Sequence, residues 1–234
     1  MILKPPKGAM LNRGHPLSRG LKGCWIFNEG GGTIVNDLSG NGKNGALDAG
    51  CSWVPGKFGN AVYTPDSSNE VTFNAYYDIS KGFSVVLWYY LVALPGPYGS
   101  YSTDNIIKGY VDATHSFYFQ VREYAALGYA IQSFLAAGAA RVDSSVYYAD
   151  PPGNGRWAQL IFTWDTLNQR TYVDNILIDT KANTGTPTKN IGVQLLGSSS
   201  DLISDHLIVY NRALSASEIA QLYMTPFRIF QESF

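Results

Sequence analysis

Hydrophobic and polar positions alternate over short segments of the chain, and clusters of Gly, Asn, Asp and Pro separate these segments. Such a pattern is typical of β-strands joined by tight turns. It predicts strands at residues 23–28, 83–94, 116–122, 126–134, 156–164, 170–174, 175–181, 193–196 and 202–210. No long helical pattern lies between them, so the sequence indicates an all-β sandwich of two antiparallel sheets.

Three local patterns add detail to this picture. Residues 83–94 are apolar on both faces, as expected for a central strand. The Asp-Asn pair at 174–175 predicts a tight hairpin, because both residue types tolerate a left-handed backbone. Residues 215–218 read Ser-Ala-Ser-Glu, a capping box that predicts one short helix with Ile219 and Leu222 on its apolar face.

The two ends of the chain differ from the middle. Residues 1–20 contain four Pro and Gly residues before residue 15, which prevent a helix. We expect this segment to contribute few side chains to the core. We therefore expect an extended N-terminal arm over 1–20, one domain over 21–223 and an aromatic tail over 224–234. Because the tail has no core of its own, we expect Phe227, Phe230 and Phe234 to dock on this domain or on a neighbouring subunit.

Charged residues make up 15% of the chain, whereas about 25% is usual for a soluble domain. A surface rich in Tyr and poor in Lys and Glu suits contact with sugars or with other proteins. The alternative is that an all-β chain simply carries more of its 16 Tyr and 24 Gly. The net charge of −1 gives no indication of a nucleic-acid partner.

Cys24 and Cys51 are too few for a disulfide framework, and they could pair only if their strands were neighbours. The first twenty residues lack the apolar segment of a signal peptide, and no segment reaches the length of a membrane span. We therefore expect a protein that is made in the cytoplasm and has no membrane partner.

Several segments, taken in order, match a known family. They are LKGCWIFNEGGGT at 21–33, DLSGNGKNGAL at 37–47, GKFGNAV at 56–62, FSVVLW at 83–88 and DHLIVYNRALSASEI at 205–219. Over about residues 21–223 the chain resembles the laminin-G-like, concanavalin A-like jelly-roll domains. The resemblance implies a jelly-roll sandwich of two antiparallel sheets with a short C-terminal helix.

Residues 11–21 and 222–230 resemble stand-alone versions of this domain that tailed phages and prophages encode. This implies a non-enzymatic virion protein, made in the host cytoplasm, that decorates the capsid or belongs to the tail. It would form homo-oligomers, assemble with the major capsid or tail protein, and adhere to surface glycans. A carbohydrate-binding module is the alternative function, and a glycoside hydrolase is a third.

Catalytic motifs are missing from the sequence. Retaining hydrolases of this fold carry two carboxyl groups in a Glu-x-Asp-x-x-Glu pattern. None of the five glutamates here is followed by Asp two residues later. The three histidines lack zinc-site spacing, and there is no Gly-x-Ser-x-Gly motif. We therefore expect that the protein is not an enzyme.

The resemblance also implies a calcium ion that joins the first and last strands through a carboxylate and main-chain carbonyl groups. The matching positions are Glu29 and Asp205, and Asp37 and Asn41 are further candidates. The alternative is that these side chains hydrogen-bond turn amides. His206 stands where the family commonly has an acid, which removes one ligand.

Sugar binding or subunit contact would need aromatic side chains in exposed loops. The candidate tyrosines are Tyr76, Tyr77, Tyr98, Tyr101, Tyr110, Tyr147 and Tyr148. Trp25, Trp88 and Trp164 fall within strand patterns, so we expect them in the core.

Overall fold

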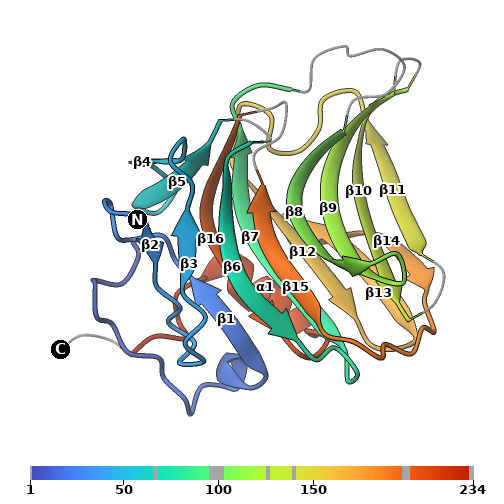
Figure 1. The fold of residues 1–234 in the computed structure, drawn as a ribbon, viewed down its shortest axis with the longest axis horizontal. Helices are drawn as coiled ribbons and strands as arrows, with labels where there is room; N and C mark the ends of the chain where they lie inside the picture. Colours follow the sequence, from blue (N-terminus) through green and yellow to red (C-terminus); the bar gives the residue numbers. More distant parts are fainter. Residues whose placement is uncertain are drawn as a thin grey trace.

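The computed structural model describes residues 2–65, 68–94, 103–124, 127–138, 141–196 and 201–231. Two eight-stranded antiparallel sheets lie face to face, as predicted (Figure 1). The back sheet has the order β14 (Ile176–Ala182), β13 (Asn168–Val173), β12 (Ala158–Trp164), β7 (Phe83–Leu91), β16 (Leu202–Tyr210), β5 (Asn60–Thr64) and β4 (Ser52–Pro55), with β1 (Leu21–Trp25) also paired to β16. The front sheet has the order β11 (Val142–Tyr148), β10 (Gly128–Ala137), β9 (His115–Tyr124), β8 (Thr103–Asp112), β15 (Ile191–Leu196), β6 (Glu70–Tyr77), β3 (Gly45–Leu47) and β2 (Ile34–Val35).

The first and last strands of the domain are neighbours. In β1, Gly23 lies opposite Val209 of β16, and Trp25 lies opposite Leu207. This pairing brings the two segments that resemble the start and the end of the jelly-roll domain into one sheet. The hairpin between β13 and β14 is also confirmed, since Asp174 and Asn175 have φ of 48° and 67°.

The central strand β7 is buried on both of its faces. Alternate residues, such as Leu87, point between the sheets, where they pack with aromatic side chains including Phe117 and Phe119 of β9. Its remaining apolar residues, Val86 and Trp88, point away from the front sheet into a second cluster. This arrangement explains why residues 83–94 show no polar face in the sequence.

The second cluster lies on the outer face of the back sheet. Helix α1 (Ala216–Met224) covers this face together with a 3-10 turn, η1 (Pro16–Ser18), and the aromatic tail. Leu17, Ile219 and Leu222 are fully buried there. The expectation that residues 1–20 bury little is therefore wrong, because Leu17 fills part of this cluster.

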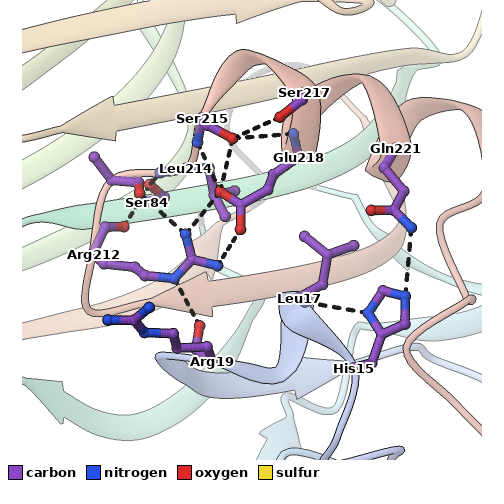
Figure 2. A network of polar contacts seen from close by, with 11 residues as sticks. His15, Leu17, Arg19, Ser84, Arg212, Leu214, Ser215, Ser217, Glu218 and Gln221 are labelled. Carbon is purple, nitrogen blue, oxygen red and sulfur yellow. Dashed lines mark hydrogen bonds and ion pairs between the residues drawn. The ribbon is translucent and has the colours of Figure 1, made fainter.

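A polar network fastens the start of α1 to the rest of the domain (Figure 2). The capping box is confirmed: Ser215 Oγ accepts from Glu218 N, and the Glu218 carboxylate accepts from Ser215 N at 2.9 Å. The Arg212 guanidinium donates to both Glu218 oxygens, at 2.8 and 2.6 Å. Arg212 Nε also donates to the carbonyl oxygen of Arg19 at 2.8 Å, so the arm is held in the same network.

The aromatic tail pairs with the arm. Asn12 N donates to the carbonyl oxygen of Ile229 at 2.8 Å, and Gln231 N donates to that of Met10 at 2.8 Å. Phe227 and Phe230 are buried in their own domain, with exposed fractions of 9% and 6%. Of the two alternatives that the sequence left open, docking on this domain is therefore confirmed for these two rings, and the interface role is corrected, because burial of their apolar surface within the chain leaves them unavailable to a neighbour.

Both described cysteines carry free thiols. Cys24 is buried in the outer cluster, whereas Cys51 packs against the core between the sheets. The two therefore lie on opposite sides of the back sheet. Among the described residues, no helix has the length and apolar character to cross a membrane.

Candidate functional site

The structure does not bring the four predicted calcium ligands together. The Asp37 carboxylate is saturated by main-chain donors of its own loop and of β1, because it accepts from Ser39 N at 2.9 Å, Lys43 N at 3.0 Å and Cys24 N at 3.0 Å. Asn41 uses its side-chain NH2 group as a donor, to Ser39 Oγ at 2.8 Å. These two residues stabilise a turn, which is the alternative that the sequence left open.

Glu29 lies in the loop after β1. One carboxylate oxygen, Oε1, accepts from Asn36 N at 2.7 Å and from Asn36 Nδ2 at 3.0 Å. Glu29 and Asp37 both border a hollow of about 900 Å³. Asp205 does not line that hollow; it lies in β16, next to β5 in the back sheet, and its side chain is fully buried.

Asp205 instead meets a cation from the arm. Lys4 Nζ lies 3.0 Å from Asp205 Oδ1, and the two side chains are 4% and 0% exposed. The other carboxylate oxygen accepts from Phe58 N at 3.1 Å. The ring of His206 completes the group, with Nδ1 3.3 Å from Asp205 Oδ1.

Main-chain carbonyl groups surround the same ammonium. Lys4 Nζ donates to the carbonyl oxygens of Asp205 at 2.7 Å, of Asn60, and of Phe27 at 3.5 Å. Phe27 has φ of 48°, a left-handed conformation that is strained for a bulky residue. The chain thus holds a strained residue where its carbonyl group faces the cation.

The segment at 56–62, which carries part of the family resemblance, shapes this site. A Cβ atom at Gly56 would lie 2.5 Å from Asp205 Oδ2 and 2.6 Å from the Cβ of Ala61. Only glycine therefore lets the carboxylate approach the turn closely enough to accept from Phe58 N. The motif makes room for Asp205.

The charges at this site follow from burial and pairing. Burial lowers the pKa of Lys4 to about 8, although Asp205 opposes the change, so the amine is protonated at neutral pH. Burial raises the pKa of Asp205, but the His206 hydrogen bond and the Lys4 charge outweigh it and leave the pKa below its usual value. Burial lowers the pKa of His206, which is neutral at pH 7. The buried group is one ion pair with a neutral imidazole.

These residues do not fit a calcium ion while Lys4 is in place. Calcium binds six to eight oxygen atoms, and here the ammonium takes the carboxylate oxygen and the carbonyl groups. Within the ranges that the structure describes, no group of three His, Cys, Asp or Glu side chains could hold a metal ion.

The predicted tyrosines separate into two sets. Tyr76, Tyr110 and Tyr147 are 58%, 53% and 47% exposed, and all three lie on the outer face of the front sheet. Tyr77 is 3% exposed and belongs to the core, and Tyr148 is half-buried against that core. Tyr98, Tyr101 and Phe234 lie outside the described residues.

A hollow of about 440 Å³ lies on this outer face. Its lining includes Tyr118 of β9 and Phe134 of β10, whose ring centroids lie 4.4 Å apart with planes inclined by 27°. The Arg141 guanidinium carbon lies 3.7 Å above the Phe134 ring, and its Nε donates to Asp143. The hollow is lined by Asn105, Tyr110, Ala113, Ser116, Tyr118, Gln120, Phe134 and Arg141.

A network of buried amide side chains lies next to this hollow. Gln120 Nε2 donates to Gln132 Oε1, and Gln132 Nε2 donates to Ser145 Oγ at 2.7 Å and to the Tyr124 hydroxyl at 2.8 Å. The amide orientations are therefore fixed by neighbours. Because Gln120 and Gln132 are each 5% exposed, this network supports the hollow rather than forming its surface. The side chains that reach the surface, Tyr110, Tyr118 and Arg141, combine aromatic and polar groups that can contact a sugar ring and its hydroxyl groups.

Reasoning from loops missed Tyr118, Phe134 and Arg141. The signal was present in the strand at 115–124, where Phe117, Phe119 and Val121 face the core. Period-two alternation then places Tyr118, Gln120 and Tyr124 on the opposite face. Aromatic and amide side chains that alternate with the core residues of this strand would have indicated a binding surface on the outer face of the front sheet.

The comparisons with known proteins agree with this fold. A family model described as the concanavalin A-like lectin/glucanases superfamily matches residues 55–220. No curated protein matches the sequence significantly.

Solved structures with the same fold include three binding domains. The botulinum neurotoxin serotype G binding domain has 14% identity and a TM-score of 0.69, over 87% of this chain and 50% of that one. The binding domain of Paraclostridial mosquitocidal protein 1 has 15% identity and a TM-score of 0.69, over 91% and 53%. The binding domain of botulinum neurotoxin DC, solved in complex with SialylT, has 12% identity and a TM-score of 0.68, over 89% and 52%.

The chain spans about half the length of these solved structures. At such identities the likeness shows the fold alone. The family model, by contrast, matches more than half of the sequence itself, and on that ground the protein belongs to the concanavalin A-like lectin/glucanases superfamily.

Proposed function

We propose that this protein is a non-catalytic adhesion module that binds glycans on the outer face of its front sheet. One observation carries the proposal: the stacked Tyr118 and Phe134 rings, with Arg141 above Phe134 and the exposed Tyr110 beside them, border a polar hollow. Tyr110 is exposed and Tyr118 is half-buried, so these two rings can offer aromatic faces to a sugar ring, whereas Phe134 is only 4% exposed and supports Tyr118 and Arg141. The Asn105 amide and the Arg141 guanidinium line the hollow and can supply hydrogen bonds to hydroxyl or carboxylate groups.

Coverage of the two sheets supports this choice of face. Helix α1, η1 and the tail cover the outer face of the back sheet. The front sheet carries three exposed tyrosines on its outer face instead. Aromatic side chains are costly to leave in water and are enriched at binding surfaces, so their position favours the front sheet.

The residues around the hollow favour binding over hydrolysis. Glycoside hydrolysis uses two carboxyl groups on either side of the scissile bond. The described residues that line the hollow include no carboxyl group. Structures of the same fold include a botulinum neurotoxin domain in complex with SialylT and another in complex with N-acetylneuraminic acid, which supports including sialylated glycans among the ligands to test.

A glycan array tests the proposal, with sialylated glycans printed beside their unsialylated counterparts. We expect the wild type to bind at least one glycan class, and Tyr110→Ala to reduce that binding tenfold or more. Tyr76→Ala is the matched control, since Tyr76 is equally exposed on the same sheet but borders a different hollow. No binding by the wild type, or equal loss in both variants, would contradict the proposal.

A place on a phage virion is a finer proposal. It is supported by residues 11–21 and 222–230, which resemble phage-encoded versions of the domain, and which pack together here through the bridge between Leu11 and Phe230. In that setting the module would be a capsid decoration or tail-associated protein, contacting major capsid or tail subunits and further copies of itself. Mass spectrometry of purified virions tests this, together with adjacency of the gene to capsid, portal or tail genes.

A further inference from the structure

The buried ammonium of Lys4 lies between the first and last strands of the domain. Phe27 follows β1 by two residues, Asp205 belongs to β16, and Lys4 Nζ bonds to carbonyl groups of both. The resemblance to jelly-roll domains led us to expect a calcium ion at this junction. We infer that the Lys4 ammonium is a built-in substitute for a structural calcium ion, and that removing it opens a calcium site.

The oxygen atoms around Nζ are those that a hard cation prefers. They comprise one carboxylate oxygen of Asp205 and three main-chain carbonyl oxygens, from Phe27, Asn60 and Asp205. Calcium binds carboxylate and carbonyl oxygens and completes its shell with water. The donor set therefore suits a metal ion as well as an ammonium group.

These four oxygen atoms, called the oxygen cage below, are held in place by parts of the chain other than Lys4. Asn60 begins β5, Asp205 lies in β16, and Gly56 admits the Asp205 carboxylate to its position. Phe27 keeps its strained conformation at the edge of the same cage. Because these elements are fixed by sheet pairing, we expect the oxygen atoms to stay in place when the lysine side chain is shortened.

The arm is attached by bonds that do not involve the Lys4 side chain. Lys4 N donates to the carbonyl oxygen of Phe58 at 3.0 Å, and Asn28 Nδ2 donates to that of Pro5 at 3.0 Å. A shortened side chain at position 4 would thus leave the arm docked and the cage accessible to ions.

Charge explains why a tethered cation suits this cage. Asp205 supplies the carboxylate that contacts the ammonium, Glu29 acts on it only by a smaller electrostatic effect, and the neighbouring His206 is neutral. A calcium site with one carboxylate is weak, with dissociation constants on the order of 10⁻⁴–10⁻³ M. A cation on the chain itself is always present at a high effective concentration, so the fold needs no ion from solution.

Thermal unfolding of four proteins in EDTA and in 5 mM CaCl2 tests the inference. We expect the wild type and Lys7→Ala, which alters an exposed lysine of the same arm, to unfold at the same temperature in both buffers. Lys4→Ala should be less stable than the wild type in EDTA. Its unfolding temperature should rise by about 3 °C when the calcium concentration exceeds its dissociation constant tenfold. Lys4→Met should gain nothing, because its side chain fills the cage without leaving room for an ion.

The double variant Lys4→Ala/Asp205→Asn provides a third control, since loss of the carboxylate should abolish the rise in unfolding temperature with calcium. If Lys4→Ala does not fold in EDTA, circular dichroism after refolding in CaCl2 becomes the measurement. Recovery in calcium supports the inference. A wild type stabilised by calcium, or a Lys4→Ala variant that responds no more than Lys4→Met, would overturn it.

Discussion

Lys4 Nζ and Asp205 Oδ1 are 3.0 Å apart, although 201 residues separate them in the chain. The arm is therefore joined to the last strand by a buried ion pair. A buried charge is tolerated only when its partner and its hydrogen bonds are complete. Asp205 meets this condition through Lys4, His206 and the main-chain amide of Phe58.

Asp205→Asn should lower the free energy of unfolding by about 3–5 kcal/mol, because it leaves the Lys4 ammonium buried without a counter-charge. Urea unfolding at pH 7 measures the effect. Lys4→Met/Asp205→Asn should be more stable than Asp205→Asn alone, since the double variant removes both charges.

Asp201→Asn is the control for that measurement. Asp201 accepts from the Tyr63 hydroxyl at 2.7 Å at a partly buried position, and an asparagine oxygen can still accept this bond. We expect a change below about 1 kcal/mol. Equal effects at positions 201 and 205 would contradict the importance assigned to the buried ion pair.

Glu218→Gln should make stability less dependent on acid pH. Burial raises the pKa of Glu218, but Arg212 and the Ser215 amide together lower it by more than burial raises it. The pKa of Glu218 is therefore below its ordinary value of 4.5. A depressed folded-state pKa means that the unfolded chain binds more protons near pH 4.5, so this contribution is complete above pH 4.5 and is lost as pH falls through the folded-state pKa. The difference between wild type and variant should be about 1–2 kcal/mol at pH 7 and should shrink below pH 4.5.

Ser215→Ala separates the cap from the charge. It removes the hydroxyl cap and should cost about 1 kcal/mol at every pH. The Arg212 guanidinium still bonds the Glu218 carboxylate in this variant, so the dependence on acid pH should remain. If Ser215→Ala loses the dependence on acid pH, then Ser215 and not Arg212 is the main cause of the lowered Glu218 pKa, and our assignment is wrong.

Phe227→Ala tests whether the tail belongs to this domain. The ring packs edge-on against Phe58 at 5.5 Å and contacts the His206 ring at 5.1 Å, so truncation should cost about 3–5 kcal/mol in urea unfolding. Met224→Ala, at a side chain that is 65% exposed, should change stability by less than about 0.5 kcal/mol. A Phe227→Ala protein as stable as the Met224→Ala control would mean that the tail does not rely on this packing.

Strand periodicity and turn residues predicted much of the fold. The segments at 83–94 and 202–210 became the paired central strands β7 and β16, and the capping box at 215–218 begins α1. Local patterns suffice there because apolar periodicity reports burial directly. The strands β2 to β6, β8 and β11 were not predicted. For β2 and β3 the reason is that two or three residues in a Gly-rich loop carry no measurable period.

The sites were harder to predict because their residues meet only in three dimensions. Glu29 and Asp205 looked like calcium ligands from their places beside the first and last strands. Nothing in the local sequence of Lys4, between Leu3 and Pro5, indicates that its amine reaches Asp205. Tyr118 and Phe134 were missed for another reason: candidate aromatic residues were sought in loops, whereas these two lie in strands, on the face that alternation turns away from the core between the sheets.

The pairing of the arm with the tail has a practical consequence. Arm residues such as Ile2 and Pro6 and tail residues such as Thr225 and Gln231 border one groove on the side where the back sheet is covered, away from β8 to β11 (Figure 1). A fusion partner, affinity tag or surface linkage at either end would therefore leave the Tyr110 side unobstructed. If it is attached to a solid support through either terminus, the module would keep its aromatic surface accessible to a ligand in solution.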